Sequence, residues 1–347
     1  MSADHRQRRT RLVLLLVGGL LALACVTGLA AGAIALPFRQ LPAMLLAGPG
    51  ASYDGSAVLW GIRIPRILLG ALVGATLAVA GTGLQGVFRN PLADPALIGV
   101  SSGASLGAAC CLVVGPRVLP DAALTLLPWL LPVVAFAGAL LTTAIVLVAA
   151  SRGGQRDIVT MLLTGLAIAA LAQAGTGLLV TVATDAQLRS LSFWTLGSLG
   201  GATWETLLPA AGPMLLALLL LPRDATALDL LLLGDAEAQH LGVRVAVVTR
   251  RVIVLAALGV GAAVAASGLI GFVGLVVPHA LRMLLGPTHR SLLPASMLLG
   301  AGVLVLADTV ARTVATPIEL PIGVVTALLG APLFLWMVVR RRHQEVL

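Results

Sequence analysis

Long runs of apolar residues alternate with short polar segments along the chain, and ten of these runs reach the length of a membrane-spanning helix. A helix needs about 20 apolar residues to cross the ~30 Å hydrocarbon core, where every backbone polar group must be bonded internally. The seventh and eighth runs are divided at Ser267-Gly268, because Arg251 to Arg282 is too long for one span. The predicted spans are 12–36, 64–86, 95–114, 122–150, 158–182, 204–221, 247–267, 268–286, 292–313 and 320–340. This pattern predicts an all-α polytopic membrane protein with one domain, residues 1–347.

Composition agrees with a membrane protein and excludes one class of enzyme. Hydrophobic residues make up 59% of the chain and charged residues 10%, whereas soluble domains are about one quarter charged. All basic residues are arginine, so the chain lacks the lysine with which a Walker A loop contacts nucleotide phosphates. We therefore expect no ATPase site in this chain and an energy source elsewhere. The arginines flank apolar runs rather than forming one basic face, which favours the lipid bilayer over nucleic acid as a partner.

The arginines are distributed unequally between the two sides of the predicted bundle. Sixteen fall on the side of the N-terminus: Arg6, Arg8, Arg9, Arg11, Arg89, Arg152, Arg156, Arg223, Arg244, Arg250, Arg251, Arg282, Arg290, Arg340, Arg341 and Arg342. Six fall on the other side: Arg39, Arg63, Arg66, Arg117, Arg189 and Arg312. Because arginine is concentrated in cytoplasmic loops, both termini are predicted in the cytoplasm and the protein in the inner (cytoplasmic) membrane. The first apolar run is longer than the roughly 7–15 residues of a signal peptide, so it is predicted to span.

The cysteines and glycines indicate packing rather than chemistry. Cys25, Cys110 and Cys111 lie inside apolar runs without metal-ligand or disulfide spacing, and the five histidines do not cluster, so no metal site or bound cofactor is expected. Gly70 and Gly74 form a GxxxG pair, and a ladder of glycines four residues apart runs from 99 to 107. Such small residues let helices approach closely in lipid.

Two segments are too polar to span. Residues 183–203, on the outer side, are rich in serine and glycine and predict a short helix. Residues 223–251, on the inner side, combine an apolar half with Asp235 and Glu237 and end a helical pattern at Gly242, which predicts short amphipathic helices. Such helices either lie in the lipid interface or contact a partner protein, and the acidic residues weigh against the lipid interface.

Several motifs, taken together and in order, resemble the permease subunits of ABC importers for iron-siderophores, heme and vitamin B12. They are RIPR and RNPLADP within Arg63–Ala108, LLGDAEAQHLGV at Leu232–Val243, VPH within Ser267–Ala301, and ELPIG within Glu319–Val338. The resemblance implies the type II importer permease fold, with ten helices and an inverted repeat relating helices 2–5 to helices 7–10. It further implies a homodimer with the path between its subunits, two cytoplasmic ATP-binding subunits that hold ATP and magnesium, and a periplasmic binding protein.

The resemblance assigns roles to charged residues on the outer side. Arg63, Arg66 and Arg312 match arginines that bind carboxylates on the two lobes of the binding protein, for which the guanidinium fork is suited. Arg312 could instead pair with Asp308 four residues earlier, and all three could extend toward lipid headgroups.

On the inner side the resemblance points to a contact with the ATP-binding subunit and to a gate. The residues that match the coupling pattern are Gly234, Asp235, Ala238, Leu241 and Gly242. The polar turn after the second span contains Gln85, Arg89, Asn90 and Pro91, and it could be the cytoplasmic gate or simply a capped structural turn.

The segment from Asp185 to Trp204 is most similar to heme-import permeases, where an arginine at the position of Arg189 faces the outer vestibule. Two copies in a homodimer would present two guanidiniums to the two heme propionates. Arg189 could instead pair with Asp185. We therefore expect heme as the transported substrate, with ferric siderophore and then cobalamin as alternatives. A secondary transporter is disfavoured, because mid-span acidic residues are absent from the sequence.

Overall fold

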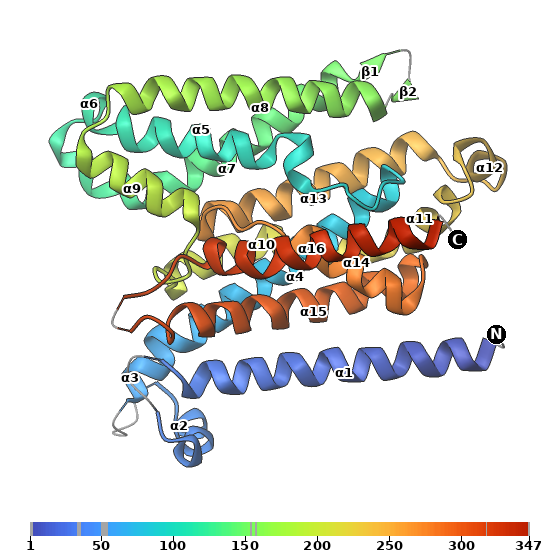
Figure 1. Ribbon diagram of the computed structural model, residues 1–347. Helices are drawn as coiled ribbons and strands as arrows, with labels where there is room; N and C mark the ends of the chain where they lie inside the picture. The colour runs from blue at the N-terminus through green and yellow to red at the C-terminus, as the bar shows by residue number, and fades with distance from the viewer. Residues whose placement is uncertain are drawn as a thin grey trace.

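The computed structural model describes residues 3–32, 36–49, 55–152, 155–156, 158–316 and 318–345. Each of the ten predicted spans corresponds to one helix, which confirms the all-α polytopic fold (Figure 1). These helices are α1 (Ala3–Ala30), α4 (Ile64–Val87), α5 (Val100–Val113), α7 (Leu127–Ala149), α8 (Ile158–Thr181), α10 (Trp204–Leu220), α13 (Val245–Ser267), α14 (Val273–Leu285), α15 (His289–Ala311) and α16 (Ile322–Glu345).

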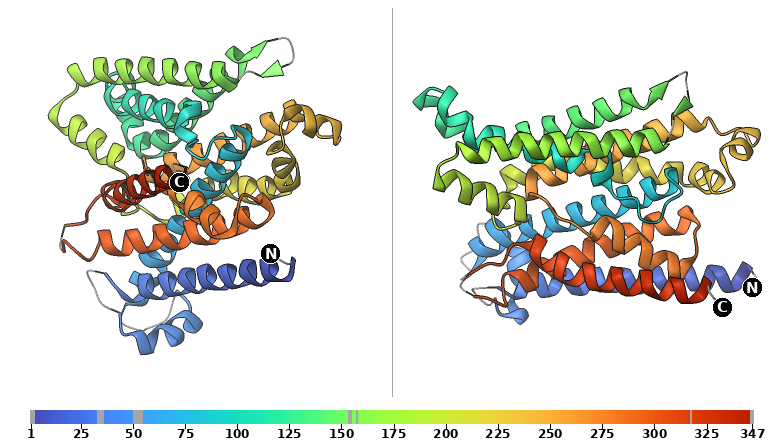
Figure 2. Two further views of the ribbon diagram at one scale, coloured as in Figure 1. Left: turned by 45° about the vertical axis from the view of Figure 1, so that its right-hand side comes forward. Right: turned by 45° about the horizontal axis from the view of Figure 1, so that its top comes forward.

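The helices run roughly along one direction, so the bundle has two distinct ends (Figure 2). One end carries the start of α1, the end of α16, the two-residue strands β1 (Ser151–Arg152) and β2 (Gln155–Arg156), and the short helices α11 (Ala225–Leu231) and α12 (Asp235–His240). We call it the coupling end. The opposite end carries α2 (Leu41–Ala47), α3 (Ser56–Val58), α6 (Gly115–Val118) and α9 (Asp185–Leu196), and we call it the α9 end.

Short helices occur where the sequence predicted polar segments and also where it did not. Helix α9 confirms the predicted helix in 183–203, and α11 and α12 confirm those in 223–251. Helices α2 and α3, in the connection between the first two spans, were not predicted from the sequence. Four further short turns adjoin longer helices: η1 (Phe38–Gln40), η2 (Leu59–Arg63), η4 (Asp121–Leu126) and η5 (Leu221–Asp224).

Two spans are interrupted where continuous helices were predicted. The range 95–114 begins with the 3-10 turn η3 (Pro95–Ile98), and Gly99, at φ +84°, separates it from α5. The range 268–286 begins with non-helical residues, where Gly268 and Phe272 have φ near +70°, so α14 starts only at Val273. Helices of 14 and 13 residues reach about 20 Å, less than the hydrocarbon thickness. In the part of the chain that the structure describes, seven helices are long and apolar enough to cross a membrane alone.

The first predicted span is confirmed as a helix, but its ends were wrong. Helix α1 begins at Ala3, includes the polar residues before Leu12, and ends at Ala30 rather than at residue 36. Residues 33–35 of that prediction lie outside the described part. An apolar run shows where a helix is in contact with lipid, whereas caps and chain connections decide where it ends.

Close glycine contacts hold the helices together, as the sequence predicted. A Cβ atom on Gly74 of α4 would lie 2.2 Å from the carbonyl oxygen of Gly300 in α15. One on Gly103 of α5 would lie 2.3 Å from the carbonyl oxygen of Gly138 in α7. Real Cβ atoms do not approach oxygen so closely, so these backbone contacts require glycine.

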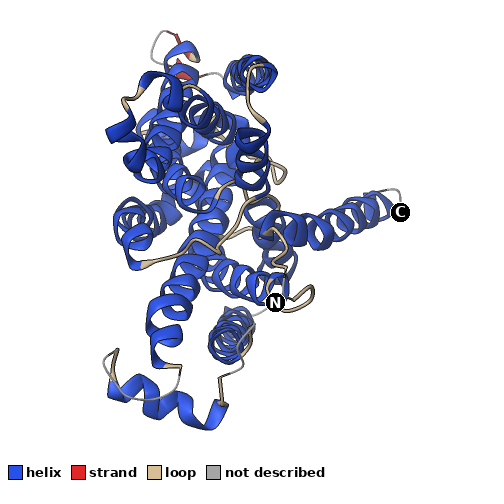
Figure 3. Ribbon diagram, turned by 90° about the vertical axis from the view of Figure 1, so that its left-hand side faces the viewer, coloured by secondary structure: helices blue, strands red, loops and turns tan. Residues whose placement is uncertain are grey.

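The contacts between helices follow a repeat. Helix α4 packs on α15, and α13 packs on α7, while α5 packs on α7 and α14 on α15. Let α4, α5, α7 and α8 be matched in order to α13, α14, α15 and α16. The contact of α4 with α15 then corresponds to that of α13 with α7, and the contact of α5 with α7 corresponds to that of α14 with α15. The two interrupted helices, α5 and α14, take equivalent places, one broken toward each end of the bundle. Figure 3 shows the packing from the α9 end, with α16 leaning away from the other helices.

Candidate functional site

A cluster of three arginines and two carboxylates lies at the α9 end, where α4, α15 and the start of α16 meet. Asp308 of α15 accepts hydrogen bonds from Nε and Nη2 of Arg66 in α4, at 2.9–3.1 Å. Glu319, just before α16, accepts from Nη1 and Nη2 of Arg66 at 3.0 Å. Arg312 Nε lies 3.6 Å from Asp308 Oδ2, so one carboxylate serves two arginines.

The other two arginines of this cluster close the end of α1. Arg63 donates to the carbonyl oxygen of Leu29, and Arg312 donates to that of Gly28 at 2.5 Å. The last carbonyls of a helix have no partner within the helix and carry partial negative charge. The two guanidiniums therefore fix the end of α1 against α4 and α15.

The predicted docking arginines are consequently buried in this structure. Arg63, Arg66 and Arg312 are 3%, 6% and 6% exposed. The alternative pairing of Arg312 with Asp308 is confirmed. Docking of a binding protein on these residues stays a prediction, and it requires that at least one internal partner give way.

The predicted coupling residues form a compact turn–helix–turn at the opposite end. Gly234 precedes α12 with φ +118°, and a Cβ atom there would lie 2.3 Å from Oε2 of Glu237. Gly242, at φ +87°, closes α12 in a Schellman motif: its N–H donates to Gln239 and the N–H of Val243 donates to Ala238. Ala238, within α12, is fully buried. Only glycine fits these two backbone conformations without strain.

The outer face of this segment is apolar and exposed. Leu232, Leu233 and Leu241 surround α12 with 41%, 61% and 58% of their surfaces exposed, beside the exposed carboxylates of Asp235 and Glu237. Several exposed leucines close to exposed carboxylates in one short segment are typical of a protein-contact site.

Ion pairs and hydrogen bonds join the coupling segment to three spanning helices. Buried Asp224 accepts from Nε of Arg251 in α13 at 2.8 Å. Asp229 of α11 accepts from the backbone N–H of His289 in α15 at 2.5 Å and lies 3.0 Å from its Nδ1. These links and the packing of α11 on α15 and α4 attach the segment to the spans.

The predicted gate turn adjoins the coupling segment, which the sequence analysis did not anticipate. Nη2 of Arg89 lies 3.4 Å from Oδ1 of Asp235, so the end of α4 contacts the start of α12. Arg89 has φ +47°, because α4 ends in a Schellman motif whose left-handed position is occupied by arginine instead of glycine.

The rest of the turn is held by local hydrogen bonds. Asn90 Oδ1 accepts from the N–H of Leu92, Pro91 lies between them, and Asp94 Oδ1 accepts from the N–H of Ala96. Burial raises the pKa of the Asp94 carboxyl, while its hydrogen bond from Ala96 acts in the opposite direction. Gln85 is buried, and its Nε2 is 3.5 Å from the carbonyl oxygen of Gly274. The capped structural turn is therefore observed, and a gating role stays a prediction.

Arg189 lies on α9, a helix that starts with a capping box formed by Thr184 and Gln187. The side chain of Arg189 is exposed, and it makes no ion pair with Asp185 or with any other residue that the structure describes. The predicted alternative, an i−4 pair, is therefore not present. Its guanidinium is available to a ligand at the α9 end.

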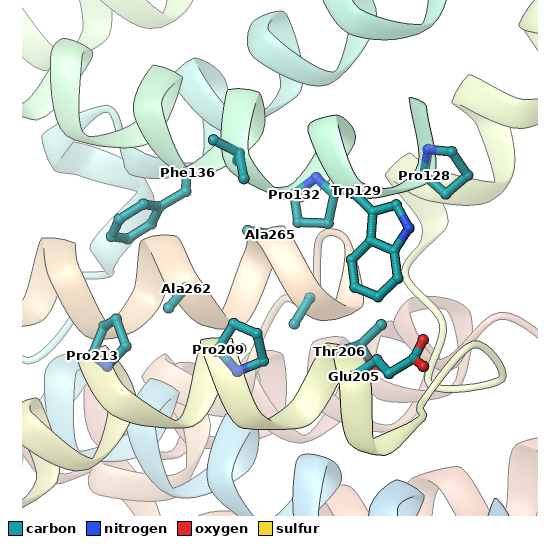
Figure 4. Close-up of a pocket in the computed structure, with 13 residues that line it drawn as sticks. Pro128, Trp129, Pro132, Phe136, Glu205, Thr206, Pro209, Pro213, Ala262 and Ala265 are labelled. Atoms are coloured by element: carbon teal, nitrogen blue, oxygen red, sulfur yellow. The ribbon is translucent and has the colours of Figure 1, made fainter. Parts of the chain in front are cut away.

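An apolar cavity of about 230 Å³ lies between α7, α10 and α13 (Figure 4). Trp129 and Glu205 lie at one end of it, and Phe136 and Pro213 lie at the other. None of the predicted site residues lines this cavity. It is smaller than the roughly 300–1,000 Å³ typical of ligand pockets, so it is not a path for a large substrate.

Four acidic residues organise both ends: Asp224 and Asp229 at the coupling end, and Asp308 and Glu319 at the α9 end. From the sequence, only Asp308 was assigned a partner. A signal was available, because the chain has only 14 acidic residues. An acidic residue near a span is costly unless it is paired, so each one indicates a partner. Apart from the i−4 pairing of Asp308 with Arg312, the sequence does not show which arginine or histidine that partner is.

The fold and its two ends define a polytopic membrane permease with an exposed coupling segment at one end and an arginine cluster at the other. Residues 19–340 match the model of the FecCD transport family, and the chain belongs to this family. It is 45% identical to the hemin transport system permease protein HmuU of Yersinia pestis, over 95% of this chain and 97% of that protein. It is 42% identical to the cobalamin import system permease protein BtuC of Halobacterium salinarum, over 86% and 76% of the two chains.

A solved structure supports the same family assignment. The chain superposes with a TM-score of 0.81 and 35% identity on a metal-chelate type ABC transporter in an inward-facing conformation, covering 95% of this chain and 99% of that one. The resemblance inferred from the motifs is therefore confirmed. The chain is an ABC importer permease of the inner membrane, a transport subunit rather than the ATPase.

Proposed function

We propose that this chain is the permease subunit of a heme importer, which receives heme from a periplasmic binding protein and passes it to the cytoplasm. Arg189 carries the proposal. Its guanidinium is exposed at the α9 end and makes no ion pair within the described part of the chain, so two copies would present two positive charges to the two propionates of heme. The 45% identity to a hemin permease supports the same substrate.

The transport path in this proposal lies between two copies of the chain. The 230 Å³ cavity within one copy is too small and is not lined by Arg189. Among the seven described helices that are long enough to span alone, α8 is the least buried, with 11% of an 18-residue window buried, and its surface is available to lipid or to a second subunit. A homodimer closes such a surface with two-fold symmetry.

Two cytoplasmic ATP-binding subunits would supply the energy by contacting α12 at the coupling end. The exposed surface of Leu232, Leu233 and Leu241 provides the contact, and the links of Asp224, Asp229 and Asp235 to α13, α15 and α4 carry its motion into the bundle. ATP and magnesium bind to those subunits. The permease would then open alternately to the two sides of the membrane.

Uptake into proteoliposomes that contain the permease, the ATP-binding subunit and the cognate binding protein tests the substrate. Heme is expected to enter, and ferric siderophore and cobalamin are not. Cobalamin is the second candidate because of the 42% identity to a cobalamin permease, and uptake of cobalamin without heme would overturn the proposal.

An Arg189→Ala variant tests the residue that carries the proposal. Heme transport should fall about tenfold if one charge-assisted contact per subunit is lost. Arg39→Ala is a matched control, because Arg39 is also exposed at the α9 end but lies beside α2, away from α9. Equal heme transport by Arg189→Ala, Arg39→Ala and the wild type would remove Arg189 from the substrate path.

A further inference from the structure

The guanidinium of Arg66 is shared by two carboxylates that differ in their access to water. Asp308 binds Nε and Nη2, and its side chain is 5% exposed. Glu319 binds Nη1 and Nη2, and its side chain is 48% exposed. Arg66 itself is 7% exposed in its side chain, so Glu319 covers the outward edge of an otherwise buried cation.

These two contacts differ in how easily they can be exchanged. Breaking the buried pair with Asp308 would leave an uncompensated charge inside the protein, which is strongly unfavourable. The bond to Glu319 competes with water and contributes little net stability. An incoming carboxylate can therefore replace Glu319 on Nη1 and Nη2 while Asp308 keeps its hold on Nε.

Glu319 also lies at a junction of four structural elements. The next residue, Leu320, donates its N–H to the carbonyl oxygen of Ala311 at the end of α15. Ile322, the first residue of α16, donates to the carbonyl oxygen of Gly197 at the end of α9. A Cβ atom on Gly200, in the connection to α10, would lie only 2.9 Å from Oε2 of Glu319. Displacement of Glu319 would thus loosen the start of α16 where it meets α9.

We propose that Glu319 is an internal substitute for the carboxylate of a docking protein, which displaces it from Arg66 and thereby releases the start of α16. The cluster has three arginines and two carboxylates, so it retains a net positive charge that attracts a further carboxylate. The inference accounts for docking on an arginine that is buried in the free permease. It rests on the proposed function, in which a periplasmic binding protein docks on the permease.

The test is the affinity of the substrate-loaded binding protein for the permease complex in lipid nanodiscs, measured by surface plasmon resonance. Glu319→Gln removes the competing charge while it keeps the size of the side chain. The dissociation constant is expected to fall about threefold to tenfold, as for removal of one exposed competing ion pair. An unchanged or larger dissociation constant would overturn the proposal.

Two further variants separate this inference from the docking step and from general charge effects. Glu205→Gln removes an exposed glutamate in the first turn of α10, at the same end but outside the cluster, and should not change the affinity. Arg66→Lys keeps a positive charge beside Asp308 but loses the bidentate fork, so docking should weaken. If Arg66→Lys weakens docking and Glu319→Gln has no effect, docking on Arg66 stands and the substitute role of Glu319 is wrong. If neither variant alters the affinity, docking on Arg66 is wrong as well.

Hydrogen exchange gives a readout at the proposed release point. Backbone amides of residues 318–324 should exchange faster when the binding protein is added to the wild type. In Glu319→Gln they should exchange faster even in the free complex, whereas Glu205→Gln should behave as the wild type. Unchanged protection of these amides on docking would show that α16 is not released.

Discussion

Asp308 is the residue that balances the charge of the arginine cluster. It contacts Arg66 at 2.9 Å and Arg312 at 3.6 Å, and all three side chains are shielded from water. Removing one member of a buried ion pair is costly because its partners remain charged in a low-dielectric environment.

We therefore predict that Asp308→Asn lowers the free energy of unfolding by about 3–5 kcal/mol. Thermal unfolding of the purified permease in detergent measures the change. Glu319→Gln, which removes a half-exposed partner of the same arginine, should cost less than about 1 kcal/mol. Equal stability of the two variants would mean that burial does not distinguish these carboxylates.

Gly234 is the residue whose backbone sets the start of the coupling helix. We predict that Gly234→Ala reduces ATP-dependent transport severalfold, because a φ of +118° and contact with Glu237 together impose about 1–3 kcal/mol of strain on any side chain. Transport and binding of the ATP-binding subunit are measured together. Gly201→Ala is the control, since a Cβ atom there meets open space. Normal binding and transport by Gly234→Ala would contradict the assigned role of this turn.

At the scale of elements, α11 is the part of the coupling segment that contacts α15. Asp229 forms this link through the backbone and ring of His289, which is completely buried. Thr226 of α11 makes a second link to α15 by accepting from Arg290 at 3.0–3.1 Å, but this contact is exposed.

We predict that Asp229→Asn separates ATP hydrolysis from transport. The variant should hydrolyse ATP at a nearly normal rate but use severalfold more ATP for each molecule transported, because a partly buried hydrogen bond worth about 1–3 kcal/mol is weakened. Parallel assays of phosphate release and uptake in proteoliposomes measure this ratio. Thr226→Val should leave the ratio close to that of the wild type, and a similar loss in both variants would argue against a specific role for Asp229.

At the scale of the whole molecule, the arginine distribution and the fold together predict an orientation. The coupling end carries the arginine-rich ends of α1 and α16 as well as α12, and the α9 end carries few arginines. The asymmetry predicts that the coupling end faces the cytoplasm.

Cysteine labelling tests this orientation. In a variant without the three native cysteines, Ser192→Cys on α9 should react with a membrane-impermeant maleimide added to intact spheroplasts. Gln239→Cys on α12 should react only after the membrane is permeabilised. Both side chains are exposed, so accessibility reports the side of the membrane rather than burial. The reverse pattern would overturn the predicted topology.

The sequence by itself determined the number and approximate position of the ten spans and of the short helices in 183–203 and 223–251, but not α2 and α3. It could do so because the bilayer requires each segment to satisfy its own backbone hydrogen bonds, and this requirement is local to the segment. The glycines at 74 and 103 were also recognisable, since they repeat at a spacing of four residues along a span, and those at 234 and 242 matched the coupling pattern of the family.

Only the tertiary structure decided which charges pair between different helices. Arg66 and Asp308 are 242 residues apart in the chain, and Arg89 meets Asp235 from a different helix. It also decided that α5 and α14 are interrupted, because neighbouring elements supply hydrogen bonds to the backbone beside the breaks. For example, the N–H of Ser198 donates to the carbonyl oxygen of Ser267, the last residue of α13 before the break. The physical reason is the same in both cases: helix formation depends on neighbours in sequence, whereas the partner of a charge or of a free carbonyl depends on how the helices pack.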